Sequence, residues 1–165
     1  MTTLWQGKYL EVRREGTWEY AARVADIGAA VILAITDARE IVLVEQYRVP
    51  HGARSLELPA GLIGDTEDND TAIAAAAREL AEETGFEAAH WHDIGAFATS
   101  PGMSSEMFHL FKATGLTRTG PGGGVAGEDI TVHVVALSGL RGFIAAARAR
   151  DLVIDCRLVV ALALV

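Results

Sequence analysis

The chain has 165 residues, half of them hydrophobic and 22% charged, which predicts one folded domain over residues 1–165 and excludes a disordered chain. Its 14 Lys and Arg against 22 Asp and Glu give a net charge of −8, which argues against a protein that holds nucleic acid mainly through phosphate contacts. The single cysteine, Cys156, excludes an internal disulfide and a four-cysteine zinc site, and we expect it to be a small buried hydrophobic residue.

No uncharged run approaches the roughly 20 residues that a membrane-spanning helix needs. The N-terminal segment also lacks the apolar region of a signal peptide. We therefore expect a cytoplasmic protein with no membrane partner.

The first half of the chain predicts mainly strands. Two of them, joined by a glycine turn, are expected at Lys8–Arg14 and Thr17–Val24. The apolar, β-branched segments Ile27–Ile35 and Glu40–Tyr47 predict a central hairpin with one strand buried on both faces. Residues 50–70 are expected to be mostly loop.

Thr71–Thr84 is the clearest helix, and Gly85 is expected to end it. Its predicted inward stripe has helical spacing and consists of Ile73, Ala76, Ala77 and Leu80. In the second half, strands are expected at Ile94–Ala98, Met107–Ala113 and Ile130–Leu137, and closing helices at Leu140–Arg150 and Asp155–Leu164. The Gly-rich segment Thr117–Gly127 is predicted to be mobile. These elements predict an α/β fold with a mixed sheet covered by helices.

Three carboxylates share one face near the end of the predicted helix. Glu79, Glu82 and Glu83 stand at positions i, i+3 and i+4, where like charges repel and where the helix dipole disfavours anions. Arg78 can compensate only part of this charge, by pairing with Glu82 at i+4. A hard divalent cation would convert the repulsion into coordination, and Mg²⁺ prefers carboxylate oxygen and bridging phosphates.

The segment around these glutamates resembles the Nudix box, G-x5-E-x7-R-E-U-x-E-E-x-G-U with U an apolar residue. The matching residues are Gly64, Asp70, Arg78, Glu79, Leu80, Glu82, Glu83, Gly85 and Phe86. In this register Asp70 replaces the first Glu. In a second register, Gly61 and Glu67 take the first two places and three extra residues precede Arg78. Pro59-Ala60-Gly61 favours the second register, with a short insertion in the loop before the helix.

Further segments look like the ADP-ribose pyrophosphatase branch of that family. They are TWEYAAR (Thr17–Arg23), EQYR (Glu45–Arg48), LELPAG (Leu56–Gly61), SPGMSSE (Ser100–Glu106) and GEDITVHVV (Gly127–Val135). The resemblance therefore covers nearly the whole chain. It implies a Nudix-type α/β/α sandwich around a mixed sheet, with an N-terminal antiparallel strand pair that takes part in a homodimer.

The resemblance also implies the residues of a metal site that uses Mg²⁺, with Mn²⁺ as an alternative. Glu79, Glu83 and the carbonyl oxygen of Ala60 would be metal ligands, and Glu82 a further ligand or bridging carboxylate. Arg78 would hold the glutamates in place. Glu128, in the Gly-rich loop, would close on the metal site and activate water.

Asp129 is the alternative to Glu128 as the water-activating residue, and Glu106 could assist the metals. Substrate contacts are implied for Trp18, which could stack on an adenine, and for Arg23 and Arg48, which could bind phosphate or ribose oxygens. Leu62 could line the pocket.

The implied activity is metal-dependent hydrolysis of the pyrophosphate bond of a nucleoside diphosphate sugar, with ADP-ribose as the first candidate. A GDP-sugar or a dinucleotide stays open as the substrate, because the box sets the chemistry and not the base. A nucleotide-sensing module that has lost catalysis is the alternative from another class, and the intact Glu79, Glu82 and Glu83 argue against it. An mRNA-processing role is disfavoured by the net charge of −8.

Overall fold

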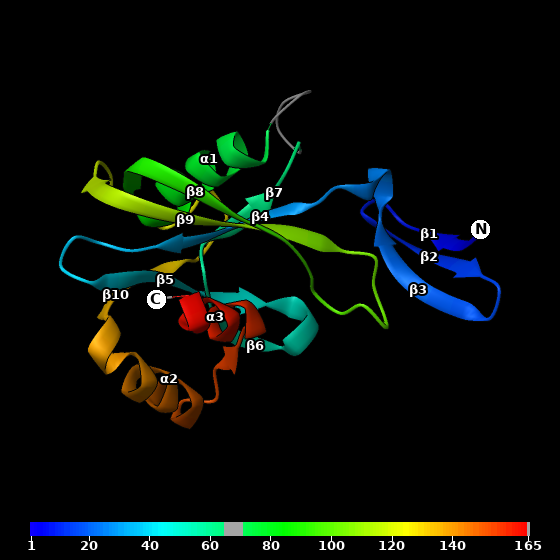
Figure 1. Ribbon diagram of the computed structural model, residues 1–165. Coiled ribbons are helices and arrows are strands. Elements are labelled where there is room, and N and C mark those ends of the chain that lie inside the picture. Colours follow the sequence, from blue (N-terminus) through cyan, green and yellow to red (C-terminus); the bar gives the residue numbers. More distant parts are fainter. Residues whose placement is uncertain (65–70, 165) are drawn as a thin grey trace.

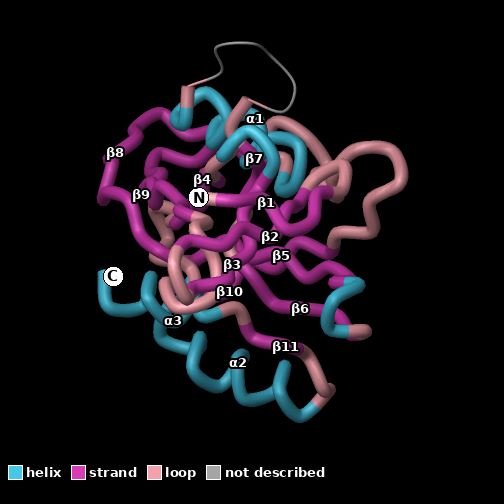
Figure 2. Tube along the Cα trace, turned by 90° about the vertical axis from the view of Figure 1, so that its right-hand side faces the viewer, coloured by secondary structure: helices cyan, strands magenta, loops and turns pink. Residues whose placement is uncertain are grey.

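The computed structural model describes residues 1–64 and 71–164, and places two central sheets between layers of helix (Figure 1). Helix α1 (Ala72–Thr84) covers one side of the sheets, and helices α2 (Leu140–Ala149) and α3 (Cys156–Ala161) cover the other. The view turned by 90° shows the same order of layers, with α1 at the top and α2 and α3 at the bottom (Figure 2). The predicted α/β sandwich is confirmed.

Both central sheets have four strands and mix parallel with antiparallel pairs. The sheet under α1 runs in the order β7 (Ala60–Leu62), β4 (Ala29–Ala34), β9 (Met107–Arg118), β8 (Phe86–Ala98). The second sheet runs in the order β10 (Thr131–Ala136), β5 (Glu40–Arg48), β6 (Ala53–Glu57), β11 (Val153–Ile154). The expectation of mostly loop over residues 50–70 therefore missed β6 and β7.

The predicted central hairpin is wrong in its pairing. Strands β4 and β5 follow one another in the chain but lie in different sheets, with an isolated bridge between Ile35 and Ile41 at the turn that connects them. Strand β4 pairs in parallel with β9 instead, with Ala29 opposite Phe108. Periodicity identifies a buried strand but does not identify its neighbours.

Strand β4 is buried along its whole length, as predicted, because it separates two cores. Alternate side chains point to opposite faces of a strand, so Val31 and Leu33 join the core toward α2 and α3, while Ala30 and Ile32 join the core under α1. This central strand positions the two helical layers relative to each other.

Helix α1 begins at the N-cap Thr71, whose hydroxyl accepts a hydrogen bond from the Ala74 N–H (3.2 Å). Its buried face differs from the predicted stripe. Ile73 is 45% exposed and Ala77 is also exposed. The side chains that face the sheet are Ala75, Ala76, Leu80, Glu83 and Thr84. The helix is rotated so that a carboxylate, rather than the isoleucine, points inward.

A separate three-stranded antiparallel sheet stands off the core at the N-terminus (Figure 1). It consists of β1 (Thr2–Gln6), β2 (Leu10–Glu15) and β3 (Trp18–Arg23), so the predicted strand pair has an additional strand before it. Ala21 in β3 ties this sheet to the loop after β8, through bonds from its N–H to the Met103 carbonyl (2.9 Å) and from the Ser105 N–H to its own carbonyl (3.0 Å).

The C-terminal helices agree with the sequence in position, and one residue there does not behave as expected. Cys156 begins α3 and is exposed, because it follows the N-cap Asp155 on the outward side of the first turn. Among the described residues, no helix is both long and apolar enough to cross a bilayer.

Gly85 ends α1 in the left-handed conformation (φ 73°), where its missing side chain leaves space for another segment. An added Cβ would lie 2.2 Å from the Gly120 carbonyl oxygen. We expect Gly85→Ala to lower the free energy of unfolding by about 2–4 kcal/mol, because backbone strain and a clash with rigid backbone add together.

The matched control is Gly16→Ala. Gly16 has a similar φ of 58°, but an added Cβ meets nothing within 4 Å, so this variant should lose only about 1 kcal/mol from strain. Urea unfolding of both variants measures the difference, and equal losses would contradict the close approach of Gly120.

Candidate functional site

Two glutamates of α1 converge on the start of strand β7. The Glu83 carboxylate accepts a hydrogen bond from the Ala60 N–H (3.0 Å to Oε2). The Glu79 carboxylate lies against Gly61, where an added Cβ would be 2.0 Å from Glu79 Cδ. Only glycine admits this approach, so the Ala60-Gly61 sequence and the glutamates of α1 form one unit, as the predicted metal ligands require.

Glu83 is a buried acid of this unit. It is 5% exposed. Burial raises the pKa of Glu83 to about 8; the Ala60 N–H and Arg48 lower it, and the carboxylates of Glu79 and Glu128 raise it further. Two further carboxylates, one from the same helix and one from the Gly-rich loop, therefore disfavour the ionised form of Glu83.

Arg78 and Glu82 occupy different positions on the same helix. The Arg78 guanidinium forms an ion pair with Glu79 (Nη1 to Oε1, 2.6 Å), so it holds one of the predicted ligands. Glu82 is exposed. Its backbone carbonyl, rather than its side chain, accepts a hydrogen bond from the Gly-rich loop.

The Gly-rich loop is anchored to the C-terminal end of α1. The Gly85 carbonyl accepts bonds from the Thr119 and Gly120 N–H groups (2.8 and 3.1 Å). The carbonyls of Glu83 and Glu82 accept hydrogen bonds from the N–H groups of Gly123 and Gly124, at 2.8 and 3.0 Å. The segment predicted to be mobile is therefore bonded to the helix over its first half, through four hydrogen bonds to three carbonyls at the helix end.

The structure separates Glu128 from Asp129. The Glu128 carboxylate turns back into the loop and accepts the Val125 N–H (2.9 Å), on the side from which it acts on the pKa of Glu83. Asp129 points to strand β6 and pairs with Arg54 (Nη1 to Oδ2, 2.7 Å). Of the two alternatives left open by the sequence, Glu128 is the one whose charge raises the pKa of Glu83.

Arg48 borders the site and is held by Glu57, a buried acid for which the sequence predicted no role. Its Nε and Nη2 donate to Glu57 at 2.7 and 2.6 Å, and Glu57 is 2% exposed. Arg157, from α3, adds a second cation 3.6 Å from Glu57. Glu57 belongs to the LELPAG segment. A carboxylate beside the Pro59-Ala60-Gly61 turn was the signal in the sequence from which its role could have been found.

The remaining predicted substrate contacts lie around the N-terminal sheet. Arg23 donates from Nε to Glu106 (2.7 Å), so these two residues are paired with each other. Trp18 is 62% exposed and borders a cavity of about 360 Å³ between β3 and the loop at Pro101–Ser105. Leu62, in β7, lies opposite Ala29 of β4.

The donor set fits a hard divalent cation, although the present side-chain positions do not enclose one. Within residues 1–64 and 71–164, no three His, Cys, Asp or Glu side chains come close enough together to hold a metal ion. The oxygen donors, the raised pKa of Glu83 and the Glu79 carboxylate held against Gly61 nevertheless match what such a cation needs. Glu67 and Asp70, the alternatives for the first acid of the motif, lie outside the described residues.

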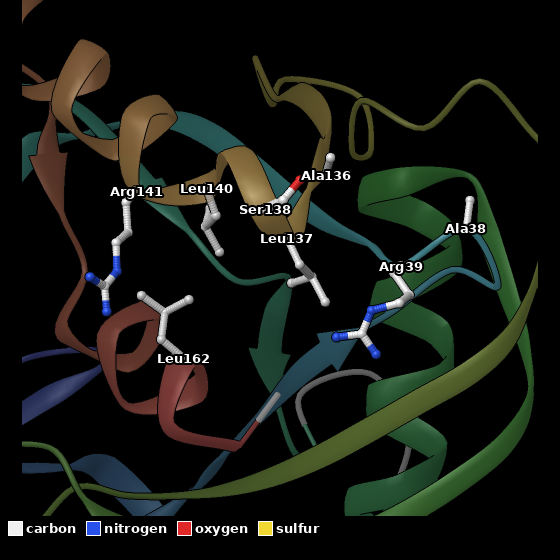
Figure 3. Close-up of a pocket in the computed structure, with 8 residues that line it drawn as sticks. All are labelled: Ala38, Arg39, Ala136, Leu137, Ser138, Leu140, Arg141 and Leu162. Carbon is white, nitrogen blue, oxygen red and sulfur yellow. The ribbon is translucent and has the colours of Figure 1, made fainter.

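A further cavity lies away from these residues (Figure 3). It measures about 520 Å³, and Arg39, Leu137, Arg141 and Leu162 are among its lining residues. None of the predicted site residues lines it.

Comparisons with known proteins identify a family that matches most of the chain. Residues 26–147 match the family model of the NUDIX domain. The methanol dehydrogenase activator of Bacillus methanolicus is 40% identical over 111 residues (67% of this chain, 58% of that protein). The ADP-ribose pyrophosphatase of Bacillus subtilis (strain 168) is 41% identical over 90 residues (54% and 47%). The GDP-mannose pyrophosphatase of Citrobacter koseri is 32% identical over 132 residues (75% and 67%).

A solved structure shares the fold. The crystal structure of an ADP compounds hydrolase superposes with a TM-score of 0.68, over 87% of this chain and 80% of that one, at 22% sequence identity. The chain spans about half the length of the first two curated relatives.

The raised pKa of Glu83 predicts how the stability of the metal-free protein depends on pH. In the unfolded chain Glu83 loses its proton near its ordinary pKa of 4.5, whereas in the folded protein it keeps the proton up to about pH 8. The folded state thus binds more protons in this window, and its stability falls as the pH rises from 4.5 to 8. Glu83→Gln removes this loss, so we expect the variant to be about 2 kcal/mol, or roughly 4–8 °C, more stable near pH 8.

Thermal unfolding in excess chelator at pH 5 and pH 8 measures this effect. Glu82→Gln is the matched control, since it removes the same charge from an exposed position of the same helix turn. A gain for Glu83→Gln that is equal at both pH values, or is matched by the control, would contradict the assignment to a buried carboxyl.

Proposed function

The chain belongs to the Nudix family, as its sequence predicted, and from that premise we propose that it hydrolyses the pyrophosphate bond of ADP-ribose. Water adds to one phosphorus, the bridging P–O bond breaks, and the products are AMP and ribose 5-phosphate. The approach of Glu83 to the Ala60 N–H and of Glu79 to Gly61, with the charge of Glu128 acting on the pKa of Glu83, carries the proposal. The identity to an ADP-ribose pyrophosphatase supports the substrate.

A divalent cation, Mg²⁺ or alternatively Mn²⁺, would be held by Glu79, Glu83 and the Ala60 carbonyl oxygen, with Glu82 as a further ligand. When bound, it supplies charge neutralisation on the phosphates and polarises them toward attack. Arg78 keeps the Glu79 carboxylate oriented through their 2.6 Å ion pair. Metal binding would also offset the repulsion that raises the pKa of Glu83.

Glu128 would accept the proton of the attacking water. Glu128 is exposed, and within the described residues its carboxylate accepts a hydrogen bond from the backbone of its own loop, so it is available to a water molecule at the site. Asp129 is unsuited to this role because Arg54 already occupies it. A positioned carboxylate base of this kind accelerates hydrolysis without contributing to nucleotide affinity.

Arg48 would bind a phosphate oxygen of the substrate. Glu57 fixes its Nε and Nη2, and no described residue accepts a hydrogen bond from its Nη1. A guanidinium with one face held and another available is suited to an anionic ligand. Arg23, Trp18, Leu62 and Glu106 would contact the nucleoside or ribose. A GDP-sugar is the second candidate substrate, favoured by the identity to a GDP-mannose pyrophosphatase over 75% of this chain.

The protein would act as a homodimer through its N-terminal sheet. All five residues of β1 are exposed, and β1 is an edge strand of that sheet. Leu4 and Trp5 are 43% and 59% exposed, and Tyr9 follows at 66%. An open edge with exposed aromatic side chains is a typical site for pairing with another chain.

Hydrolysis should depend on the cation and on Glu83. With Mg²⁺ or Mn²⁺ present, we expect ADP-ribose turnover, and Glu83→Gln should lower it by roughly 100-fold or more because a ligand is lost. Phosphate released after phosphatase treatment of the products measures turnover over a panel that includes ADP-ribose and GDP-mannose. Unchanged turnover in excess chelator would contradict the metal site, and no turnover of any panel member would favour a nucleotide-sensing module.

The loop carboxylates should behave differently. Glu128→Gln is expected to lower kcat by about 10²–10⁴-fold with little change in KM, because it removes the base alone. Asp129→Asn should have a much smaller effect, since an amide oxygen can still accept a hydrogen bond from Arg54. Steady-state kinetics of the two variants tests this, and the reverse order would make Asp129 the base.

A charge placed on the open edge of strand β1 should prevent dimerisation. Trp5→Glu places a charge at an exposed position of β1 and should convert the dimer to a monomer. It should also reduce activity, because in the proposed dimer the N-terminal strands complete the partner's site. Sedimentation velocity of the parent and the variant measures the mass. A parent chain that is monomeric and fully active at nanomolar concentration would contradict the proposal.

A further inference from the structure

Arg54 connects the end of the Gly-rich loop to the core of the second sheet. From strand β6, its Nη1 donates to Asp129 Oδ2 (2.7 Å), and its Nη2 lies within hydrogen-bond distance of the Asp129 carbonyl (3.2 Å) and Thr131 Oγ1 (3.3 Å). These contacts reach both the side chain and the backbone of the loop end. One guanidinium therefore fixes the residue that follows Glu128.

The other side of Arg54 is held by a buried acid. Its Nε donates to Glu45 Oε1 (2.9 Å), and its Nη2 donates to the Glu45 carbonyl (2.9 Å). Glu45 is 7% exposed, and burial opposes its ionisation. Hydrogen bonds from His133 and Arg54 and the charge of Arg150 nevertheless hold the pKa of Glu45 below its ordinary value. The carboxylate is thus ionised and fixed, which makes it a rigid support for Arg54.

The loop is then held at both ends. Its first half is bonded to the carbonyls at the end of α1, which carries Glu83, and its last residues are bonded to Arg54. Glu128 lies between these two anchors, with its carboxylate folded onto the Val125 N–H. Loss of either anchor would change the distance between Glu128 and Glu83.

We propose that Arg54 is a positioning residue that places the Glu128 carboxylate opposite Glu83. Arg54 touches neither the substrate nor the attacking water in this role. The inference rests on the proposed function, in which Glu128 activates water. A displacement of about 1 Å at a catalytic group is enough to cost up to about 100-fold in rate.

Hydrogen–deuterium exchange of the metal-free protein tests the anchor without reference to activity. Arg54→Met keeps much of the side-chain length and removes every donor. We expect faster exchange in peptides over residues 125–131, and unchanged exchange over 72–84. Arg150→Met is the matched control, because Arg150 also donates to Glu45 (3.3 Å) without touching the loop. Equal protection in all three proteins would overturn the proposal.

Kinetics then tests the consequence. Arg54→Met should lower kcat about 10- to 100-fold with KM unchanged. Arg54→Lys, which keeps the charge and loses the fork, should lie between this variant and the parent, and it serves if Arg54→Met does not fold. Arg150→Met should stay within about twofold of the parent, since it leaves the loop contacts intact.

A double variant separates positioning from a general loss of structure. In the Glu128→Gln background, Arg54→Met should cause no further loss of kcat, because the group it positions is already gone. The same loss in both backgrounds would overturn the proposal. If the parent hydrolyses nothing while the exchange result holds, the proposed function fails and the anchoring by Arg54 remains.

Discussion

The approach of α1 to the Ala60-Gly61 strand determines most of this structure. Glu79 occupies the space that a side chain at residue 61 would fill, and Glu83 accepts the Ala60 N–H from the next turn of the helix. These contacts fix the rotation of α1 about its axis, which sends Ile73 outward. The rotation in turn directs the carbonyls at the helix end toward the Gly-rich loop, so the position of Glu128 depends on the same contact.

Glu83 differs from the other buried acids of the described structure, which are Glu11, Glu45 and Glu57, because each of those three is paired with an arginine. Glu57 accepts hydrogen bonds from Nε and Nη2 of Arg48, and Glu45 accepts one from Nε of Arg54. Removing such a partner would leave an uncompensated buried charge, which is costly. Among the described residues, Glu83 accepts a hydrogen bond from the Ala60 N–H and is influenced by the charge of Arg48, while the carboxylates of Glu79 and Glu128 raise its pKa. Within this part of the chain, the acids that support the site are thus paired with arginines, and the acid proposed to meet a cation accepts a hydrogen bond from the backbone.

The sequence predicted the chemistry of the site better than its surroundings. The positions of Glu79, Glu82 and Glu83 on α1 required only helical geometry, whereas the burial of Glu83 and the exposure of Glu82 depend on how the helix packs. The partners of Arg48 and Arg23 did not follow, because a guanidinium pairs with whichever acid the tertiary fold brings near. Composition likewise described the loop as glycine-rich but did not reveal that a helix end would bind it.

Local patterns also failed where neighbours in space are distant in sequence. Ile27–Ile35 was correctly predicted to form a strand, but a turn of few residues to the next strand suggested a hairpin that the sheets do not contain. Strand β1 was missed because its residues are all exposed and carry no alternation of burial. In both cases the decisive information is the identity of the adjacent strand, and single-sequence periodicity does not contain it.

The parallel pairing of β4 with β9 has a consequence for how the chain acquires this fold during synthesis. The segment Ala29–Ala34 is apolar at every position, and its partner from Met107 onward is made long after it. The N-terminal sheet needs only local contacts and can form early, whereas β4 has to wait. Until then the nascent chain carries a short uncharged β-prone stretch without its parallel partner, and such stretches favour aggregation when they are exposed.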